Sequence, residues 1–251
     1  AILIGEKLIM SNQDHIKKIL GNIPGFDINL RKINFERLGA GRTNVSYLVQ
    51  DGIRKYVLRL NSEKSKYYNI DRSRELKILN VIKDSEIGPK VVYCDPSYNF
   101  LITEFIEGLP LLPNGVTEKN KEYLTNLISM YQGMDIDLPK FNYFDHIKKY
   151  EVFLLERSGI NKKISKKLKD FYPHLKDFQN EDWNPVLCHH DLSPSNIIKT
   201  SKGLRIIDWE FSAYGYSKFD REYLIPSKNK DSFLDNLFEI LEEMWFAISK
   251  I

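Results

Sequence analysis

The first 105 residues contain short runs of apolar and β-branched residues that end in turns. Such runs are typical of strands, and they predict strands at 33–38, 45–50, 55–60, 91–94 and 100–105. Two segments, 12–20 and 70–82, instead place their apolar residues at helical spacing. The pattern therefore predicts a β-rich N-terminal region that contains two helices.

Beyond residue 113 the apolar residues recur mainly at helical spacing. Helices are predicted at 117–131, with Thr117 as the cap, at 144–157, in two shorter pieces at 162–171 and 172–178, and at 231–248. The exceptions are a short run at 186–188 and two runs, 196–199 and 204–207, which flank a Thr-Ser-Lys-Gly turn and predict a hairpin.

A cluster of Gly108, Pro110 and Pro113 separates these two regions. We therefore predict an α+β fold with two lobes. The smaller, β-rich lobe would comprise residues 1–106, and the larger, mainly helical lobe residues 107–251.

The composition is that of a soluble globular protein, with 42% hydrophobic and 28% charged residues. A net charge of +3 is too small to argue for nucleic acid as a partner. Cys94 and Cys188 have no paired spacing, and no apolar run approaches the roughly 20 residues that span a bilayer, so we expect a cytoplasmic protein. Met10 offers a natural start, in which case residues 1–9 are vector-derived or upstream sequence.

Three polar side chains stand around the predicted hairpin. Asn196 begins its first strand, Asp208 follows its second strand, and Asp191 lies in the preceding loop, so we expect the three to be close together. A carboxylate can orient or deprotonate a hydroxyl, and an Asn with an Asp can hold Mg²⁺ against the phosphates of ATP. The alternative is a polar loop whose Asp and Asn only cap turns. Residue type, order and strand context favour phosphoryl transfer.

The pattern His189-x-Asp191-x₄-Asn196, followed by Ile206-Ile207-Asp208, is that of the catalytic core of protein-kinase-like enzymes. Over roughly residues 33–220 the chain resembles the choline/ethanolamine kinase family, including its short bacterial members, and more distantly the aminoglycoside phosphotransferases. The resemblance implies a bilobal protein-kinase-like fold that transfers the γ-phosphate of ATP to a small alcohol, with Mg²⁺. It is carried by segments 38–44, 56–59, 70–75, 88–91, 101–108, 188–196, 207–211 and 213–220.

Carried over by position, Asp191 resembles the catalytic base, and Asn196 and Asp208 resemble the Mg²⁺ ligands. His189 resembles a residue that braces the catalytic loop through hydrogen bonds. Its use as a metal ligand has little support.

The turn at 39–44 occupies the position of the loop that covers the phosphates in kinases. Gly39 and Gly41 would offer backbone N–H groups, and Thr43 and Asn44 could add further donors. An ordinary tight turn is the alternative for this segment taken alone.

Four further residues complete the nucleotide half of the predicted site. Arg59 resembles the strand cation that contacts the phosphates, and Glu75 resembles its helix partner. The alternative for Glu75 is a place on a solvated helix face. Glu104 and Ile106 flank the segment where a kinase-like fold hinges, and backbone groups there would meet the adenine edge.

Two positions depart from the family pattern. His190 stands where choline kinases commonly carry Asn. Ser227 stands seven positions after Asp220, where the family usually carries an acidic residue that helps to hold a quaternary ammonium group. The second departure weakens the case for choline as the substrate.

The acceptor side of the site is open to two interpretations. A methylated ammonium group needs aromatic faces and a nearby carboxylate, whereas a primary amine needs less of an aromatic cage. Aromatic residues at helical spacing more often belong to the core, and this is the stronger account of Trp245 and Phe238. The candidates are Glu210, Tyr214, Tyr216 and Trp245, with Tyr223, Glu222 and Glu242 as further possibilities.

The sequence thus predicts an ATP- and Mg²⁺-dependent kinase for a small amino alcohol of the choline or ethanolamine type. An aminoglycoside or thiamine kinase of the same fold is the alternative, although the basic stretch 162–169 disfavours a polycationic substrate. A pseudokinase that only binds is the alternative of another class. The joint presence of Asp191, Asn196 and Asp208 argues against it.

Overall fold

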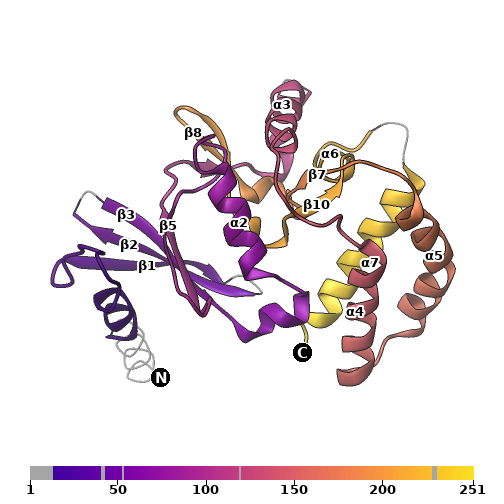
Figure 1. Ribbon diagram of the computed structural model, residues 1–251, viewed down its shortest axis with the longest axis horizontal. Coiled ribbons are helices and arrows are strands. Elements are labelled where there is room, and N and C mark those ends of the chain that lie inside the picture. The colour runs from indigo at the N-terminus through magenta and orange to yellow at the C-terminus, as the bar shows by residue number, and fades with distance from the viewer. Residues whose placement is uncertain (1–13, 41–42, 53, 119, 228–230) are drawn as a thin grey trace. The chain divides into compact units, whose positions relative to one another are not determined.

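The computed structural model describes residues 14–40, 43–52, 54–118, 120–227 and 231–251 (Figure 1). Gly41 and the expectation for residues 1–9 lie outside the described residues. The chain divides into two compact units. The first contains the described part of Ala1–Asn61 together with Val92–Phe105, and the second contains Ser62–Val91 and Ile106–Ile251.

The first unit is built on a five-stranded sheet in the order β1-β2-β3-β5-β4. The pairs β1–β2, β2–β3 and β3–β5 are antiparallel. Inward-facing Val49, Leu58 and Ile102 form a core with Ile16 and Leu20 of the helical segment 14–21. The predicted strands are confirmed; their bounds are β1 Ile33–Ala40, β2 Asn44–Asp51, β3 Arg54–Asn61, β4 Val91–Cys94 and β5 Phe100–Glu104.

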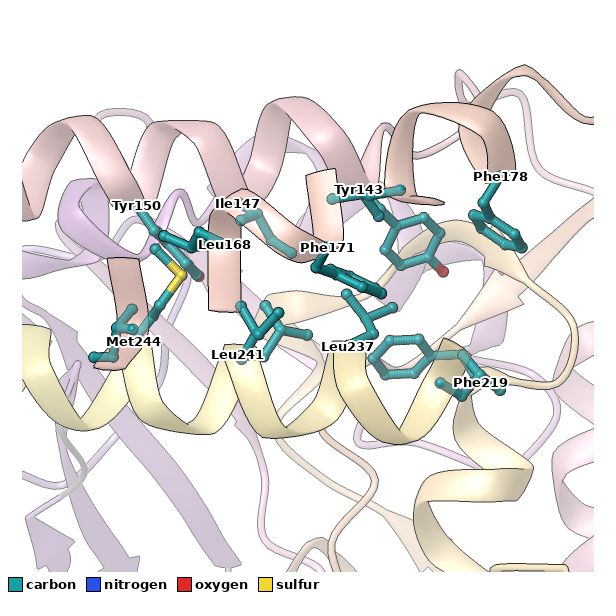
Figure 2. Packing of buried hydrophobic residues seen from close by; sticks show 14 of the residues in the cluster. Tyr143, Ile147, Tyr150, Leu168, Phe171, Phe178, Phe219, Leu237, Leu241 and Met244 are labelled. Carbon is teal, nitrogen blue, oxygen red and sulfur yellow. The ribbon is translucent and has the colours of Figure 1, made fainter. Parts of the chain in front are cut away.

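The second unit is mainly helical. Its core lies where α4, α5 and α7 pack together, and Figure 2 shows Ile147 and Tyr150 of α4 on the side that faces Leu241 and Met244 of α7. Each set repeats at helical spacing, so each helix presents one apolar stripe. The α-helices are α2 Arg72–Ile82, α3 Lys121–Gln132, α4 Tyr143–Arg157, α5 Lys162–Asn180, α6 Phe219–Leu224 and α7 Ser232–Ile248.

Two small antiparallel sheets carry the segments around Asp191, Asn196 and Asp208. The strands β8 (Ile197–Thr200) and β9 (Gly203–Ile206) form the predicted hairpin, which β6 (Leu109–Pro110) extends. The strand β7 (Pro185–Cys188) pairs with β10 (Ala213–Tyr216). The described chain also contains four 3₁₀ segments: η1 Glu63–Tyr68, η2 Pro113–Gly115, η3 Pro194–Asn196 and η4 Trp209–Phe211.

Three expectations for this region are wrong. β6 and β10 were not predicted, because each is short and gains its hydrogen bonds from a partner distant in sequence. α5 is one helix across Pro173 rather than two pieces; Leu168 and Leu175 on either side of the proline are both buried, so core packing holds the helix together. α3 begins at Lys121 rather than near Thr117, whose N–H donates to Asn120 Oδ1 in a turn before the helix.

The division of the chain differs in part from the predicted lobes. The chain passes from the first unit to the second between Phe105 and Ile106, next to the predicted limit between the lobes. Ser62–Val91, which contains α2, was predicted in the first lobe but belongs to the second unit. The assignment of the units to a nucleotide lobe and a catalytic lobe stays a prediction. Within the described part of the chain, no helix has the length and apolar character needed to cross a membrane.

Candidate active site

The β8–β9 hairpin brings the segments of Asn196 and Asp208 together. Ile197 pairs with Ile206, and the Ile207 N–H donates to the Asn196 carbonyl at 2.9 Å. Asp208 follows directly, in a left-handed backbone conformation (φ 64°, ψ 58°) that turns the chain into η4. The predicted neighbourhood of these two residues therefore follows from the register of the hairpin.

Asn196 also contacts Asp191. Its amide Nδ2 donates to the Asp191 carbonyl at 2.8 Å and to the Asp191 carboxylate at 3.2 Å. Among the described residues no donor binds the amide oxygen Oδ1 of Asn196. The side chain is thus oriented through its amide nitrogen.

His189 links the catalytic loop to the strand end before Asp208. Its Nδ1 accepts the N–H of Asp191 at 3.3 Å, and its Nε2 lies 3.0 Å from the Ile207 carbonyl. Because Nδ1 accepts, the network assigns the proton to Nε2. Burial lowers the pKa of His189 to about 4, so the ring is neutral near pH 7. These contacts agree with the bracing role that the sequence suggested.

Asp220 is the main organising residue that sequence reasoning missed. Its carboxylate accepts the backbone N–H of His189 at 2.6 Å, the N–H of His190 at 2.9 Å and the hydroxyl of Tyr131 at 2.7 Å. The residue has no exposed surface, and burial raises its pKa to about 6. The one available signal was an aspartate directly after apolar Phe219, within a matched segment to which no role was assigned.

Tyr143 contacts the imidazole ring of His190. The Tyr143 hydroxyl accepts the Tyr216 N–H at 2.9 Å and lies 2.9 Å from His190 Nε2. Gly215 of β10 packs against the same imidazole: a Cβ at that position would lie 2.5 Å from Nε2. The unpredicted strand β10 therefore forms part of the wall that positions the residue before Asp191.

A buried ion-pair network joins α2 to η4. Arg72 Nη1 lies 3.0 Å from the Glu75 carboxylate and 2.7 Å from the Glu210 carboxylate, and the three side chains are 9%, 3% and 2% exposed. The alternative of a solvated helix face is therefore wrong for Glu75. Glu210, suggested for the acceptor side, lies inside this network, and its contact with a substrate stays a prediction.

The predicted nucleotide residues of the first unit lie on β1, β2, β3 and β5, except Thr43, which directly precedes β2. Gly39 follows an irregularity in the β1–β2 pairing, and Thr43 and Asn44 are buried, with Asn44 Nδ2 donating to Thr43 Oγ1 at 3.1 Å. Arg59 Nε donates to Asn61 Oδ1 at 3.0 Å.

Glu104 and Ile106 are the remaining nucleotide candidates. Glu104 ends β5 opposite Tyr56, and buried Ile106 begins the second part of the helical unit. The Arg59–Glu75 pair and the nucleotide roles of these residues stay predictions.

Contacts in the second unit place Tyr216 and Trp245 in separate aromatic groups. The Tyr216 ring packs against Phe178 and Trp183, with centroids 5.0 and 5.7 Å away. Trp245 packs against Phe211 at 5.2 Å and donates its Nε1–H to the Tyr150 hydroxyl at 3.0 Å.

Tyr214 is engaged through its backbone: its carbonyl accepts the Phe141 N–H at 2.8 Å. These contacts are structural, and the acceptor roles proposed for Tyr214, Tyr216 and Trp245 stay predictions.

Tyr223 on α6 is closer to the reacting region than its place in the sequence suggested. Burial, and then the carboxylates of Asp191 and Glu242, raise the pKa of Tyr223 to about 12. Both carboxylates therefore act electrostatically on the Tyr223 hydroxyl. The Tyr223 ring packs against Phe238, with the ring centroids 5.3 Å apart. Tyr223 and Glu242 were only secondary candidates in the sequence.

Comparisons with known proteins indicate one family. A family model described as choline/ethanolamine kinase matches residues 35–223. The chain is 26% identical to a LicA homolog from Mycoplasma capricolum, over 80% of this chain and 76% of that protein. It is 28% identical to human ethanolamine kinase 2 over 75% of this chain, and the match spans about half (52%) of the human protein.

The fold is shared with solved structures. The choline kinase LicA from Streptococcus pneumoniae superposes with a TM-score of 0.73 at 21% identity, over 94% of this chain and 91% of that one. This likeness confirms the predicted α+β, protein-kinase-like fold. Because the family model covers well over half of its residues, the chain belongs to the choline/ethanolamine kinase family, whose members are phosphotransferases with an alcohol group as acceptor.

Proposed function

We propose that this protein uses ATP and Mg²⁺ to phosphorylate the hydroxyl of a small amino alcohol of the choline or ethanolamine type. The observation that supports this most strongly is the contact between Asn196 and Asp191. The Asn196 amide nitrogen is bound to Asp191, which leaves its oxygen as a ligand atom beside the segment of Asp208.

These residues suit a magnesium site. Mg²⁺ prefers oxygen ligands, commonly one or two protein groups together with substrate phosphates. Asn196 Oδ1 and the Asp208 carboxylate would hold the ion. When bound, Mg²⁺ bridges phosphate oxygens and offsets the charge that develops on the transferred group.

Asp191 is the proposed base. Its position is set by the Asn196 amide and by the His189 ring, while His189 itself stays neutral and engaged on both nitrogens. Asp191 would accept the proton of the substrate hydroxyl as that oxygen attacks the γ-phosphate in line with its leaving group. Orientation of a bound hydroxyl toward phosphate supplies much of the rate in such transfers.

The charges around Tyr223 favour a cationic acceptor. The Asp191 and Glu242 carboxylates both act on its hydroxyl, so an ammonium group placed beside this phenol would meet two negative charges and an aromatic face. Choline and ethanolamine both present a hydroxyl two carbons from an ammonium group. The first-unit residues Thr43, Asn44 and Arg59 are proposed to contact ATP.

A substrate screen tests the proposal directly. Purified protein with ATP and Mg²⁺ would be offered choline, ethanolamine, thiamine or an aminoglycoside, and ADP release measured. We expect turnover with choline or ethanolamine. Turnover with thiamine or the aminoglycoside alone would make the proposed substrate class wrong, and ATP binding without any turnover would indicate a pseudokinase.

Variants test the assigned roles. Asp191→Ala and Asp208→Ala should each abolish turnover while the protein remains folded by circular dichroism. Asp177→Ala, which removes an exposed carboxylate from α5, should retain wild-type turnover. Near-normal turnover by Asp208→Ala would contradict the metal assignment.

A further inference from the structure

A small cavity lies behind the catalytic loop, within the second unit. Its volume is about 20 Å³, enough for one particle the size of a water molecule. Aromatic and aliphatic side chains form most of its wall, and no carboxylate lines it. The polar side chains in the wall are Asn69, Arg74, Tyr143, His146, His190 and Trp245.

His190 presents an N–H donor in this wall. The Tyr143 hydroxyl already accepts the Tyr216 N–H, so it donates its own proton to His190 Nε2. The His190 proton therefore resides on Nδ1, a buried atom with no hydrogen-bond partner among the described residues. The Phe211 carbonyl, acting as a backbone acceptor, raises the pKa of the ring and is the weakest of the five influences on it, but it lies outside ordinary hydrogen-bond geometry for Nδ1.

His146 presents a second donor. Asn69 Oδ1 accepts from Lys149 Nζ at 3.4 Å, which orients the Asn69 amide so that its Nδ2 donates to His146 Nδ1 at 3.0 Å. The His146 proton is thereby assigned to Nε2. Burial, and then the charge of Arg74, lower the pKa of His146 to about 3, so this ring donates as a neutral imidazole.

Arg74 adds a third donor and the positive charge. Its Nε is buried without a hydrogen-bond partner among the described residues, and its guanidinium lies 5.8 Å from the centre of the Phe141 ring. Asp71 and Glu75 act on Arg74 electrostatically, but neither lines the cavity. Asp71 caps α2, and Glu75 binds Arg72.

The other polar side chains of the wall are already engaged. Trp245 Nε1 donates to Tyr150, and both hydrogen-bonding roles of the Tyr143 hydroxyl are used. The side chains therefore offer the cavity N–H donors beside one fixed positive charge. The side-chain acceptor in the wall is Asn69 Oδ1, which already accepts from Lys149, so a water molecule would be poorly matched for its two protons, whereas an anion needs donors alone.

We propose that this cavity binds a single monatomic anion of chloride size, held by Arg74, His146 and His190. A one-water volume excludes a tetrahedral oxyanion such as phosphate. The anion satisfies buried N–H groups that otherwise lack partners, and it neutralises Arg74 in an apolar wall. Because His190 directly precedes Asp191, the anion supports the turn that presents the base.

Crystals grown in sodium bromide test the site directly. Bromide scatters anomalously, so an anomalous peak is expected in the cavity within about 3.5 Å of nitrogens of Arg74, His146 and His190. Density there without an anomalous signal would identify water and overturn the proposal.

A solution measurement gives an independent answer. The melting temperature would be followed while sodium chloride replaces sodium gluconate at constant ionic strength. Wild type should show a saturable rise on the order of 3 °C at tenfold excess over the dissociation constant.

Three variants separate specific binding from a general salt effect. Arg74→Gln and His146→Phe should flatten the chloride response, because each removes one donor from the wall. Lys148→Gln removes an exposed positive charge of α4 that does not line the cavity, and it should retain the response. Equal chloride responses in wild type, Arg74→Gln and Lys148→Gln would overturn the proposal. So would no chloride response in wild type.

Discussion

The guanidinium of Arg72 lies 2.7 Å from the carboxylate of Glu210, although 138 positions separate the two residues. This ion pair joins α2 to the 3₁₀ turn that follows Asp208, and Glu75 completes it from α2. Two nearly buried carboxylates thus share one nearly buried cation. The pair ties the segment after the proposed metal ligand to a helix of the same unit.

Removal of the shared cation should therefore be costly. In Arg72→Met both carboxylates lose their contact with the Arg72 guanidinium in the interior, and we expect a loss of about 3–5 kcal/mol in the free energy of unfolding. Urea denaturation followed by circular dichroism would measure it. Arg221→Met, at an exposed position, should stay within about 0.5 kcal/mol of wild type. A loss below about 1 kcal/mol in Arg72→Met would contradict the network.

Asp220 should impose a pH dependence on stability. Its pKa is about 6 in the folded state and near 3.8 when unfolded. Between these values the folded protein holds a proton that the unfolded chain has lost, so the free energy of unfolding falls as pH rises from about 4 to 6. The fall should be about 1–3 kcal/mol relative to Asp220→Asn.

The measurement is urea denaturation of wild type and Asp220→Asn at several pH values from 4 to 7. Asp177→Asn, at an exposed position, should keep the wild-type slope. Parallel curves for wild type and Asp220→Asn would show that the carboxyl does not titrate in this range.

His189 should act as a positioning residue. His189→Phe keeps an aromatic ring beside Trp209 but loses the hydrogen bonds to the Asp191 N–H and the Ile207 carbonyl. A misplaced base should lower kcat about 100-fold with little change in the KM for ATP. Steady-state assays over pH 5.5–8 would measure both constants.

Because the pKa of His189 is about 4, the ratio of kcat between wild type and His189→Phe should be constant across that range. A ratio that titrates near pH 6.5 would instead indicate a proton-transfer role.

Gly215 should be intolerant of a side chain. A Cβ there would lie 2.5 Å from His190 Nε2 and 2.7 Å from the Tyr143 hydroxyl, and both partners are buried. Gly215→Ala should displace the imidazole next to Asp191, lowering the melting temperature and kcat together. Differential scanning fluorimetry and ADP release would report the two effects.

Gly133→Ala is the matched control for this substitution. The added Cβ would lie 3.4 Å from the Ser129 carbonyl, an ordinary contact, at a position with φ of −79°. A similar response from the two variants would mean that contact with His190 is not the cause.

The parts of the site that sequence could predict are local. The turn between β8 and β9 and the apolar runs beside it lie within a few residues of one another, so they predict the hairpin and the neighbourhood of Asn196 and Asp208. The strands of the first unit were predicted for the same reason, since each ends at a recognisable turn.

The rest depends on partners far apart in the chain. Asp220 binds the N–H groups of residues about 30 positions earlier, and Arg72 meets a carboxylate 138 positions later. No spacing rule connects such pairs. Pro173 gave a sound local reason to divide α5, but the buried stripe of the helix outweighed it.

The backbone of His190 has a positive φ of 62°, which limits the side chains that can stand before the proposed base. Asn and His enter this region far more readily than β-branched residues, for which it is strained. An exchange between Asn, common here in choline kinases, and His therefore leaves the shape of the turn intact. In this chain, an exchange of His190 for Asn would change the polar contacts of the interior while the backbone turn before Asp191 keeps its shape.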